Sequence, residues 1–183
     1  MGVASIKTAA DFESSMSQVA ATMGMTAEEI NKGSEDYKRL EKAALEMGSS
    51  TMFSASEAAE ALNYLALAGY DVDKSISTLP IILDLAASGG IDLASASDMV
   101  TDAMSALGDT AGTAESFVDK MAKTSQKSNT SVAQLGEGIL TVGGTAKVLA
   151  GETNELNTSL GILADNGIKG AEGCLLYTSP SPR

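Results

Sequence analysis

Signals for the beginning and the end of helices recur along this chain at short intervals, and they constrain its fold more than any other feature. A Ser or Thr followed three residues later by Glu or Gln is typical of a capping box, in which both side chains satisfy backbone groups at a helix start. The pattern occurs at Thr26–Glu29, Ser54–Glu57 and Ser131–Gln134. Glycines after apolar runs predict helix ends; they are Gly24, Gly48, Gly69, Gly108 and Gly167. The chain is therefore predicted to fold back repeatedly.

Between these signals the apolar residues repeat with the period of a helix, and the alternation typical of strands is almost absent. The clearest segment is FSASEAAEALNYLALAG, Phe53 to Gly69. Only 4% of the chain is aromatic, so the packing surfaces consist mainly of small and unbranched side chains. We predict an all-α fold of roughly eight short helices in a compact or loosely packed bundle with no sheet. We expect one helical module over residues 1–173, with no domain boundary inside it.

Two local features leave alternatives open. Pro80 either lies in the first turn of a new helix, where its missing N–H costs nothing, or kinks a continuous one. A helix predicted to start at Ser131 contains four glycines that each weaken it by roughly 1 kcal/mol relative to Ala. They predict a close helix crossing, a kink or a short break; they are Gly136, Gly138, Gly143 and Gly144.

Charge and composition exclude several classes of function. The formal net charge is −12, which disfavours binding to nucleic acids and to anionic lipids. The sequence contains no His, which removes the commonest general base and the commonest metal ligand. The most apolar run, Leu79 to Leu83, is too short to cross a bilayer, and no transmembrane segment is predicted.

Two motifs suggest ligand sites but fit poorly. DVDKSIS, Asp71 to Ser77, begins like a calcium loop, but Ile76 and Ile82 occupy the positions that require Gly and an acid. We interpret it as a helix N-terminus. GILTVGGTAK, Gly138 to Lys147, is glycine-rich like a phosphate-binding loop but lacks both the Gly-Lys-Ser/Thr sequence and a preceding strand.

The acidic pairs and the cysteine give no better candidate. Asp98 and Asp102 share a helix face, as do Glu57 and Glu60, but such neighbours are expected by chance among 24 acidic residues. Cys174 has no His partner that would activate it as a nucleophile. We therefore predict no catalytic, cofactor-binding or metal-binding residues, and no enzyme activity.

Four blocks in order resemble one family: FSASEAAEALNYLALAGYD, LDLAASGGIDLASASDMVTDAMSALG, TSVAQLGEGI and LGILADNGIKGAEG. Over about Phe12 to Gly173 the chain resembles the conserved region of phage tail tape measure proteins, minor tail proteins of long-tailed phages of the lactococcal type. The resemblance implies a structural virion protein that sets tail length during assembly and leaves before DNA ejection. It implies a place in the tail tube, with host cytoplasm as the site of assembly.

The resemblance also implies partners: tail tube, tail tip and tail chaperone proteins, and further copies of this chain. We expect docking through small-residue helix faces such as Ala58, Ala61 and Leu65. Truncation is expected to leave apolar faces exposed at Leu156, Leu160 and Leu163. The alternative is a helical interaction or secreted effector module unrelated to phages, which docks partner helices.

The last ten residues, CLLYTSPSPR, differ abruptly in composition from the rest and hold the only Cys and two of the three Pro. They resemble the translation of a transposase-based sequencing adapter, since TGTCTCTTATACACATCTCCGAGCCCACGA encodes them in frame. We expect residues 1–173 to be a fragment of a longer protein and residues 174–183 not to be native.

Overall fold

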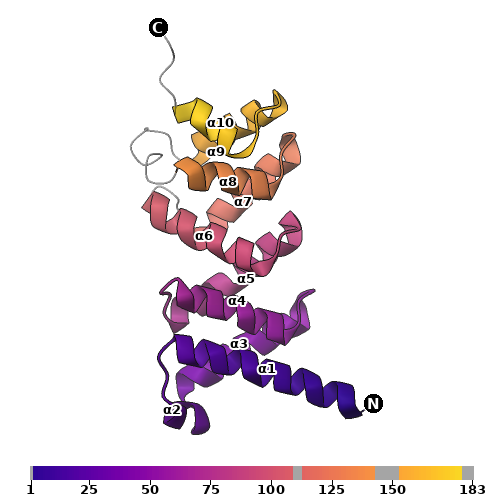
Figure 1. Cartoon of the computed structure of the whole chain (residues 1–183), viewed down its shortest axis with the longest axis vertical. Coiled ribbons are helices and arrows are strands. Elements are labelled where there is room, and N and C mark those ends of the chain that lie inside the picture. The colour runs from indigo at the N-terminus through magenta and orange to yellow at the C-terminus, as the bar shows by residue number, and fades with distance from the viewer. Residues whose placement is uncertain (1, 109–112, 143–152, 179–183) are drawn as a thin grey trace. The chain divides into compact units, whose positions relative to one another are not determined.

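The computed structural model describes residues 2–108, 113–142 and 153–178. Within these ranges the regular elements are ten α-helices and no strands (Figure 1). The predicted all-α class is confirmed. The helices are α1 (Gly2–Thr22), α2 (Ala27–Asn31), α3 (Glu35–Ser50), α4 (Ala55–Leu67), α5 (Val72–Gly89), α6 (Leu93–Leu107), α7 (Ala114–Lys127), α8 (Val132–Val142), α9 (Thr153–Asp165) and α10 (Gly170–Thr178).

The chain divides into two compact units, although no linker in the sequence marks a boundary. The N-terminal unit comprises Met1–Ala87 with Asp92–Asp98. In it α1 and α3 both pack against α4, which is the central helix (Figure 1). The alanines of α4 suit this position because small side chains let neighbouring helices approach closely. Five residues of α4 are fully buried: Ala58, Ala59, Ala61, Leu62 and Leu65.

The C-terminal unit comprises Ser88–Ile91 with Met99–Arg183. Its α8 packs against α10, α7 and α9, and α9 also packs against α7 and α10. In Figure 1 these helices run in colour from salmon at α7 to yellow at α10. The largest buried side chains here are Phe117, Met121, Leu135 and Ile139. Each unit therefore has an apolar core of its own.

All three predicted capping boxes are confirmed at helix starts. Ahead of α4, the Ser54 backbone N–H donates to Glu57 Oε2 at 2.7 Å, and the Glu57 N–H donates to Ser54 Oγ at 3.2 Å. Thr26 and Glu29 form the same pair of bonds before α2. Ser131 and Gln134 do so before α8, with both bonds at 3.2 Å.

Helix ends also follow the sequence at most of the predicted glycines. Gly69 adopts a left-handed φ of 82° after α4, a conformation that costs glycine little. The Gly69 N–H then donates to the Ala66 carbonyl at 2.9 Å and the Tyr70 N–H to the Leu65 carbonyl at 3.1 Å. This Schellman pattern satisfies two carbonyls that the last turn leaves free. The same pattern follows α1 at Gly24 and α9 at Gly167.

The prediction that Gly48 ends a helix is wrong. Helix α3 continues to Ser50, and its C-cap is Thr51, whose N–H donates to the Met47 carbonyl at 3.0 Å. Gly48 lies inside the last turn, against the start of α4. Its missing side chain permits a close approach of two helices, which the pattern of apolar residues and glycines alone does not distinguish from a helix end.

Of the two alternatives at Pro80, the structure has the continuous helix, because α5 runs without a break from Val72 to Gly89. A close crossing is the outcome for the two described glycines of α8. A Cβ on Gly136 would overlap Met99, and one on Gly138 would lie 3.3 Å from Leu160 and 3.1 Å from the Gly170 carbonyl oxygen. Gly143 and Gly144 lie outside the described residues.

The expectation that the leucines of α9 are exposed is wrong for two of the three. Leu156 and Leu160 are only 3% and 4% exposed, and Leu163 is partly buried. The reason is that α7, α8 and α10 pack around α9 within the same unit.

No single helix in the described ranges is long and apolar enough to cross a membrane. Helices α5 and α6 reach that length and apolar composition only as a pair, with a bend between them, and buried core helices share these properties.

Candidate interaction surfaces

The segment Asp71–Ser77 begins a helix, as predicted, rather than a calcium loop. Asp71 Oδ1 accepts a hydrogen bond from the Lys74 backbone N–H at 2.8 Å, the geometry of an N-cap. The Asp73 carboxylate forms an ion pair with Arg39 of α3, and this pair raises the pKa of the Arg39 guanidinium. Among the described residues, no group of three or more acidic, His or Cys side chains is arranged to hold a metal ion.

In its described part, the glycine-rich segment Gly138–Lys147 lies at the end of a helix, whereas a phosphate-binding loop would precede one. Its first residues, Gly138 to Val142, form the last turns of α8, and Gly138 is buried. The remainder, Gly143 to Lys147, lies outside the described residues.

All four carboxylates considered as pairs in the sequence are exposed: Glu57, Glu60, Asp98 and Asp102. Glu57 serves the capping box of α4, and the hydrogen bonds from Ser54 lower its pKa. Asp92 precedes α6 as its N-cap: the Ser95 backbone N–H donates to Asp92 Oδ1 at 2.9 Å, and this hydrogen bond lowers the pKa of the Asp92 carboxyl group.

Cys174 is buried in the C-terminal unit, at 1% exposure. Burial raises the pKa of its thiol, so the thiolate is scarce near neutral pH. The side chain therefore behaves as a small apolar group of the core.

The predicted docking face on α4 is not available for docking. Ala58, Ala61 and Leu65 are all fully buried, because α1 and α3 cover α4 within the N-terminal unit. The sequence pattern correctly indicated a packing face, but that face contacts α1 and α3 of the same chain and not another protein.

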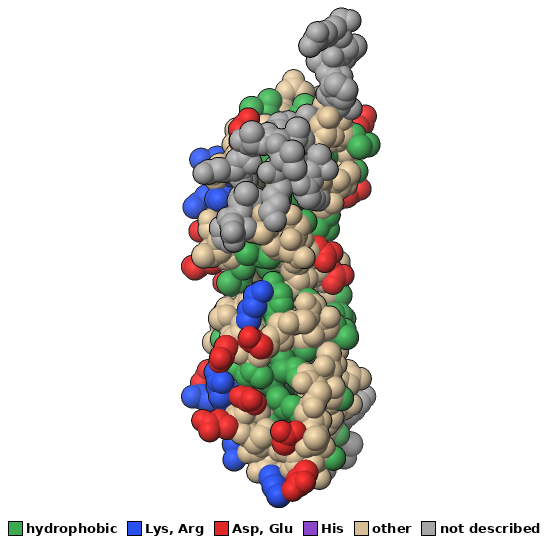
Figure 2. All heavy atoms as spheres, turned by 90° about the vertical axis from the view of Figure 1, so that its left-hand side faces the viewer, with side chains coloured by type: hydrophobic (Ala, Val, Ile, Leu, Met, Phe, Trp, Pro, Cys, Tyr) green, Lys and Arg blue, Asp and Glu red, His purple; other side chains and the backbone are tan. Residues whose placement is uncertain are grey.

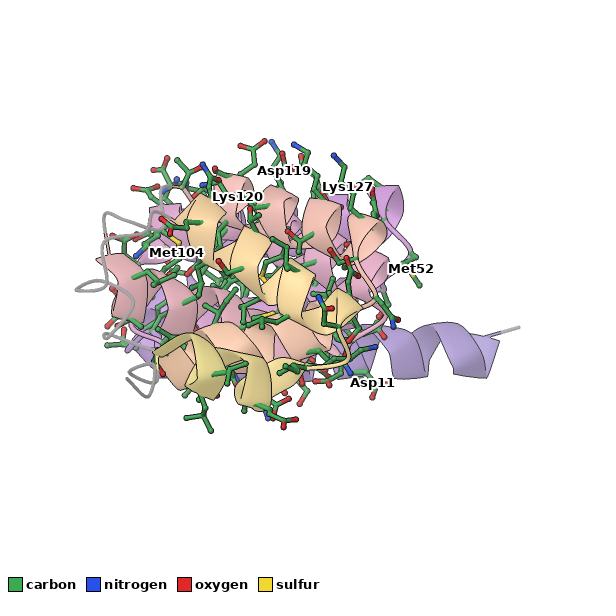
Figure 3. The ribbon with its side chains drawn as sticks, turned by 90° about the horizontal axis from the view of Figure 1, so that it is seen from above. Asp11, Met52, Met104, Asp119, Lys120 and Lys127 are labelled. Carbon is green, nitrogen blue, oxygen red and sulfur yellow. The ribbon has the colours of Figure 1, made fainter. Side chains whose placement is uncertain are left out.

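A groove of about 380 Å³ lies in the C-terminal unit between α7 and α9. Three lysines of α7 line it, spaced so that they share one face of the helix: Lys120, Lys123 and Lys127. Asn154, Thr158 and the 58% exposed Ile162 line it from α9. Figure 3 shows Lys120 and Lys127 along one outer side of α7, with Asp119 between them. We call this the lysine groove.

The lysine groove was not predicted from the sequence. The available signal was the spacing of three, then four residues between these lysines in a chain with only 12 basic residues. The overall negative charge obscured it. By sequence, the N-terminal unit holds 15 acidic and 6 basic residues, a net charge of −9, whereas the C-terminal unit holds 9 and 6, a net charge of −3.

Two adjoining hollows in the N-terminal unit have the opposite character. One, of about 450 Å³, is lined by Glu29, Asp36 and Asp71 together with apolar side chains that include Met23. The other, of about 320 Å³, shares Glu29 and Asp36 and adds Glu35 and the basic Arg39. We call the two together the acidic groove. On the face of the molecule in Figure 2, acidic side chains of this unit, red at the lower end, stand beside apolar ones.

Comparison with known proteins identifies the family of this chain. The sequence profile of phage-related minor tail proteins matches residues 41–173. The chain belongs to the phage-related minor tail protein family. Within 169 residues, 92% of its length, this minor tail protein is 35% identical to a tape measure protein of Pneumococcus phage Dp-1. That relative is much longer, and the match spans 14% of it. No solved structure matches the chain.

The family match confirms the resemblance seen in the four sequence blocks. The minor tail protein is accordingly a structural component of a phage tail. The match ends at Gly173, the last residue before the change in composition at Cys174.

Proposed function

We propose that this chain is a folded segment of a tail tape measure protein, which sets tail length during assembly and leaves the tail before DNA ejection. The observation that carries the proposal is the 35% identity to a tape measure protein across almost the whole chain. The segment takes part in assembly by binding other tail proteins, in the host cytoplasm and then inside the tail tube. We assign it no catalytic step. Glu57, considered above in an acidic pair, and Asp71, considered above in a calcium loop, both form hydrogen bonds that cap helices.

Within such a protein, this segment works as a docking module and not as part of the ruler. A ruler made of continuous helix adds about 1.5 Å of length per residue. Here α3 reverses into α4 within a few residues, and both pack side by side. A chain folded in this way contributes far less length than an extended helix of equal residue number.

The test is an in-frame deletion of residues 41–173, the family match, in the phage or prophage that encodes the protein. We expect few or no complete tails in electron micrographs, because a docking module is lost. The control is a deletion of equal length in the long helical remainder of the gene, which should give well-formed tails shorter by about 200 Å. Well-formed tails shortened by about 200 Å in both mutants would show that this segment is ruler.

A further inference from the structure

The lysine groove concentrates positive charge on a protein that is otherwise acidic. Three of the four basic residues in the described part of the C-terminal unit line it, the fourth being Lys169. Within the described residues one ion pair reaches these lysines, between Lys123 and Asp119 at 3.8 Å, and both of its side chains are well exposed. Like charges three and four residues apart on a helix repel each other. An acidic partner in the groove would relieve that repulsion.

The acidic groove of the N-terminal unit provides surface chemistry that complements the lysines. It presents four carboxylates, Glu29, Glu35, Asp36 and Asp71, beside the apolar Met23 and Met25. One cation, Arg39, also lines it and forms an ion pair with Asp36 at 3.5 Å, so the carboxylates still outnumber the basic group. Glu29 and Asp71 also cap helices, but a carboxylate has lone pairs for further donors. The lysine groove in turn offers the exposed Ile162 beside its ammonium groups. Each of the two grooves thus combines charged side chains with apolar ones.

We propose that the lysine groove of one copy of this chain binds the acidic groove of a second copy. Because the two grooves lie on different units of the chain, the contact is heterologous, and it leaves each copy with one groove free for the next. The minor tail protein then associates head to tail through ion pairs between α7 and the region around α2 and the start of α3. This inference does not depend on the tape measure role.

The charge distribution favours a second copy over a nucleic acid as the occupant. A nucleic acid is negatively charged along its whole length. Beyond the groove it would be repelled by the chain, whose net charge is −12. Two copies also repel at long range, but at physiological salt that repulsion is screened beyond about 8 Å. Contact between complementary patches is then decided locally, where the lysines face carboxylates.

The experiment measures self-association of the full chain by sedimentation velocity across a range of concentrations. We expect concentration-dependent oligomers at about 150 mM NaCl and an association constant at least about ten-fold lower at about 500 mM NaCl. Lys127→Glu should weaken association about ten-fold, whereas Lys169→Glu, an equal charge change in the same unit outside the groove, should change it by less than about two-fold. Lys127→Gln should give a smaller loss in the same direction.

A charge swap identifies the partner surface. The variant Lys120→Glu, Lys123→Glu, Lys127→Glu and the variant Glu35→Lys, Asp36→Lys should each fail to self-associate while retaining wild-type helicity in circular dichroism. Mixed together, they should associate, because the reversed grooves are again complementary.

Three outcomes would overturn the proposal. One is a monomer at every salt and protein concentration. Another is an equal effect of Lys127→Glu and Lys169→Glu on association. The third is tight binding of a double-stranded DNA oligonucleotide that the triple variant loses while its self-association is unchanged, which would make the groove a nucleic-acid site.

Discussion

Gly48 lies so close to Ala55 that a Cβ atom on Gly48 would stand 2.5 Å from the Ala55 backbone nitrogen and 2.7 Å from its Cα. Real Cβ contacts of this length essentially never occur, and the opposing atoms belong to backbone that cannot rotate away. This contact fixes the tight reversal from α3 into α4, the central helix of the N-terminal unit.

The first prediction follows from that contact. Gly48→Ala should lower the free energy of unfolding by about 1–2 kcal/mol, since overpacking of about 1–3 kcal/mol outweighs a gain in helix propensity of up to about 1 kcal/mol. Urea unfolding monitored by circular dichroism measures the change. Ser49→Ala is the control, because Ser49 is exposed and its hydroxyl bonds only to the Glu46 carbonyl of its own helix. Equal stability of the two variants would mean that α3 and α4 separate at no cost.

The second prediction concerns the capping box of α4 and its dependence on pH. Hydrogen bonds from Ser54 lower the pKa of Glu57 in the folded chain. A carboxylate with a lowered folded pKa stabilises the fold above its unfolded pKa, near 4.3, and loses that contribution as the pH falls through the folded pKa. Ser54→Ala should therefore cost about 0.5–2 kcal/mol at neutral pH. The cost should shrink below a pH of about 4.

Unfolding of wild type and Ser54→Ala in urea at a series of pH values provides this measurement. The cost of Glu57→Gln in free energy of unfolding should likewise shrink as the pH falls, because this substitution removes the charge from the capping box. Glu60→Gln removes a carboxylate from the same helix without touching the box and serves as the control. A cost of Ser54→Ala that stays constant from neutral pH to pH of about 3 would argue against a charged partner at Glu57.

The third prediction uses two apolar residues of α9 that differ in burial. Leu160 is 4% exposed and lies beside Gly138 and Gly173, whereas Ile162 is 58% exposed. Leu160→Ala should cost about 2–5 kcal/mol through lost burial and the cavity that it leaves. Ile162→Ala should change stability by less than about 1 kcal/mol. Similar costs for both would mean that α9 does not pack in this orientation.

Local structure followed from the sequence in this chain because it depends on neighbours a few residues apart. The boxes at Ser54 and Ser131 and the stop at Gly69 need only side chains and backbone within one or two turns. Those features were predicted correctly. The all-α class followed in turn, because the helical period dominates between the signals.

Tertiary relationships did not follow, because one pattern serves several partners. Ala58 and Leu65 mark an apolar helix face, but periodicity does not tell whether the chain itself or another protein covers that face. Gly48 shows the same ambiguity between a helix end and a close approach. The lysine groove depends on α9 packing beside α7, a pairing between segments about 40 residues apart that no local signal encodes.

The last prediction concerns residues 174–183. Gly173 is the last residue of the family match, and the composition changes at the next residue. Cys174 through Thr178 complete α10 in the structure, and Cys174 is buried there. The burial of Cys174 is no evidence of native origin, because a buried position beside packed helices accepts any small apolar side chain.

Sequencing the locus from genomic DNA that has never been joined to an adapter should give other codons after Gly173. We expect those codons to place a small or apolar residue at position 174, because α8 and α9 pack against this helix. Recovery of the same ten codons from unprocessed DNA would establish the tail as native and make Cys174 part of the natural core.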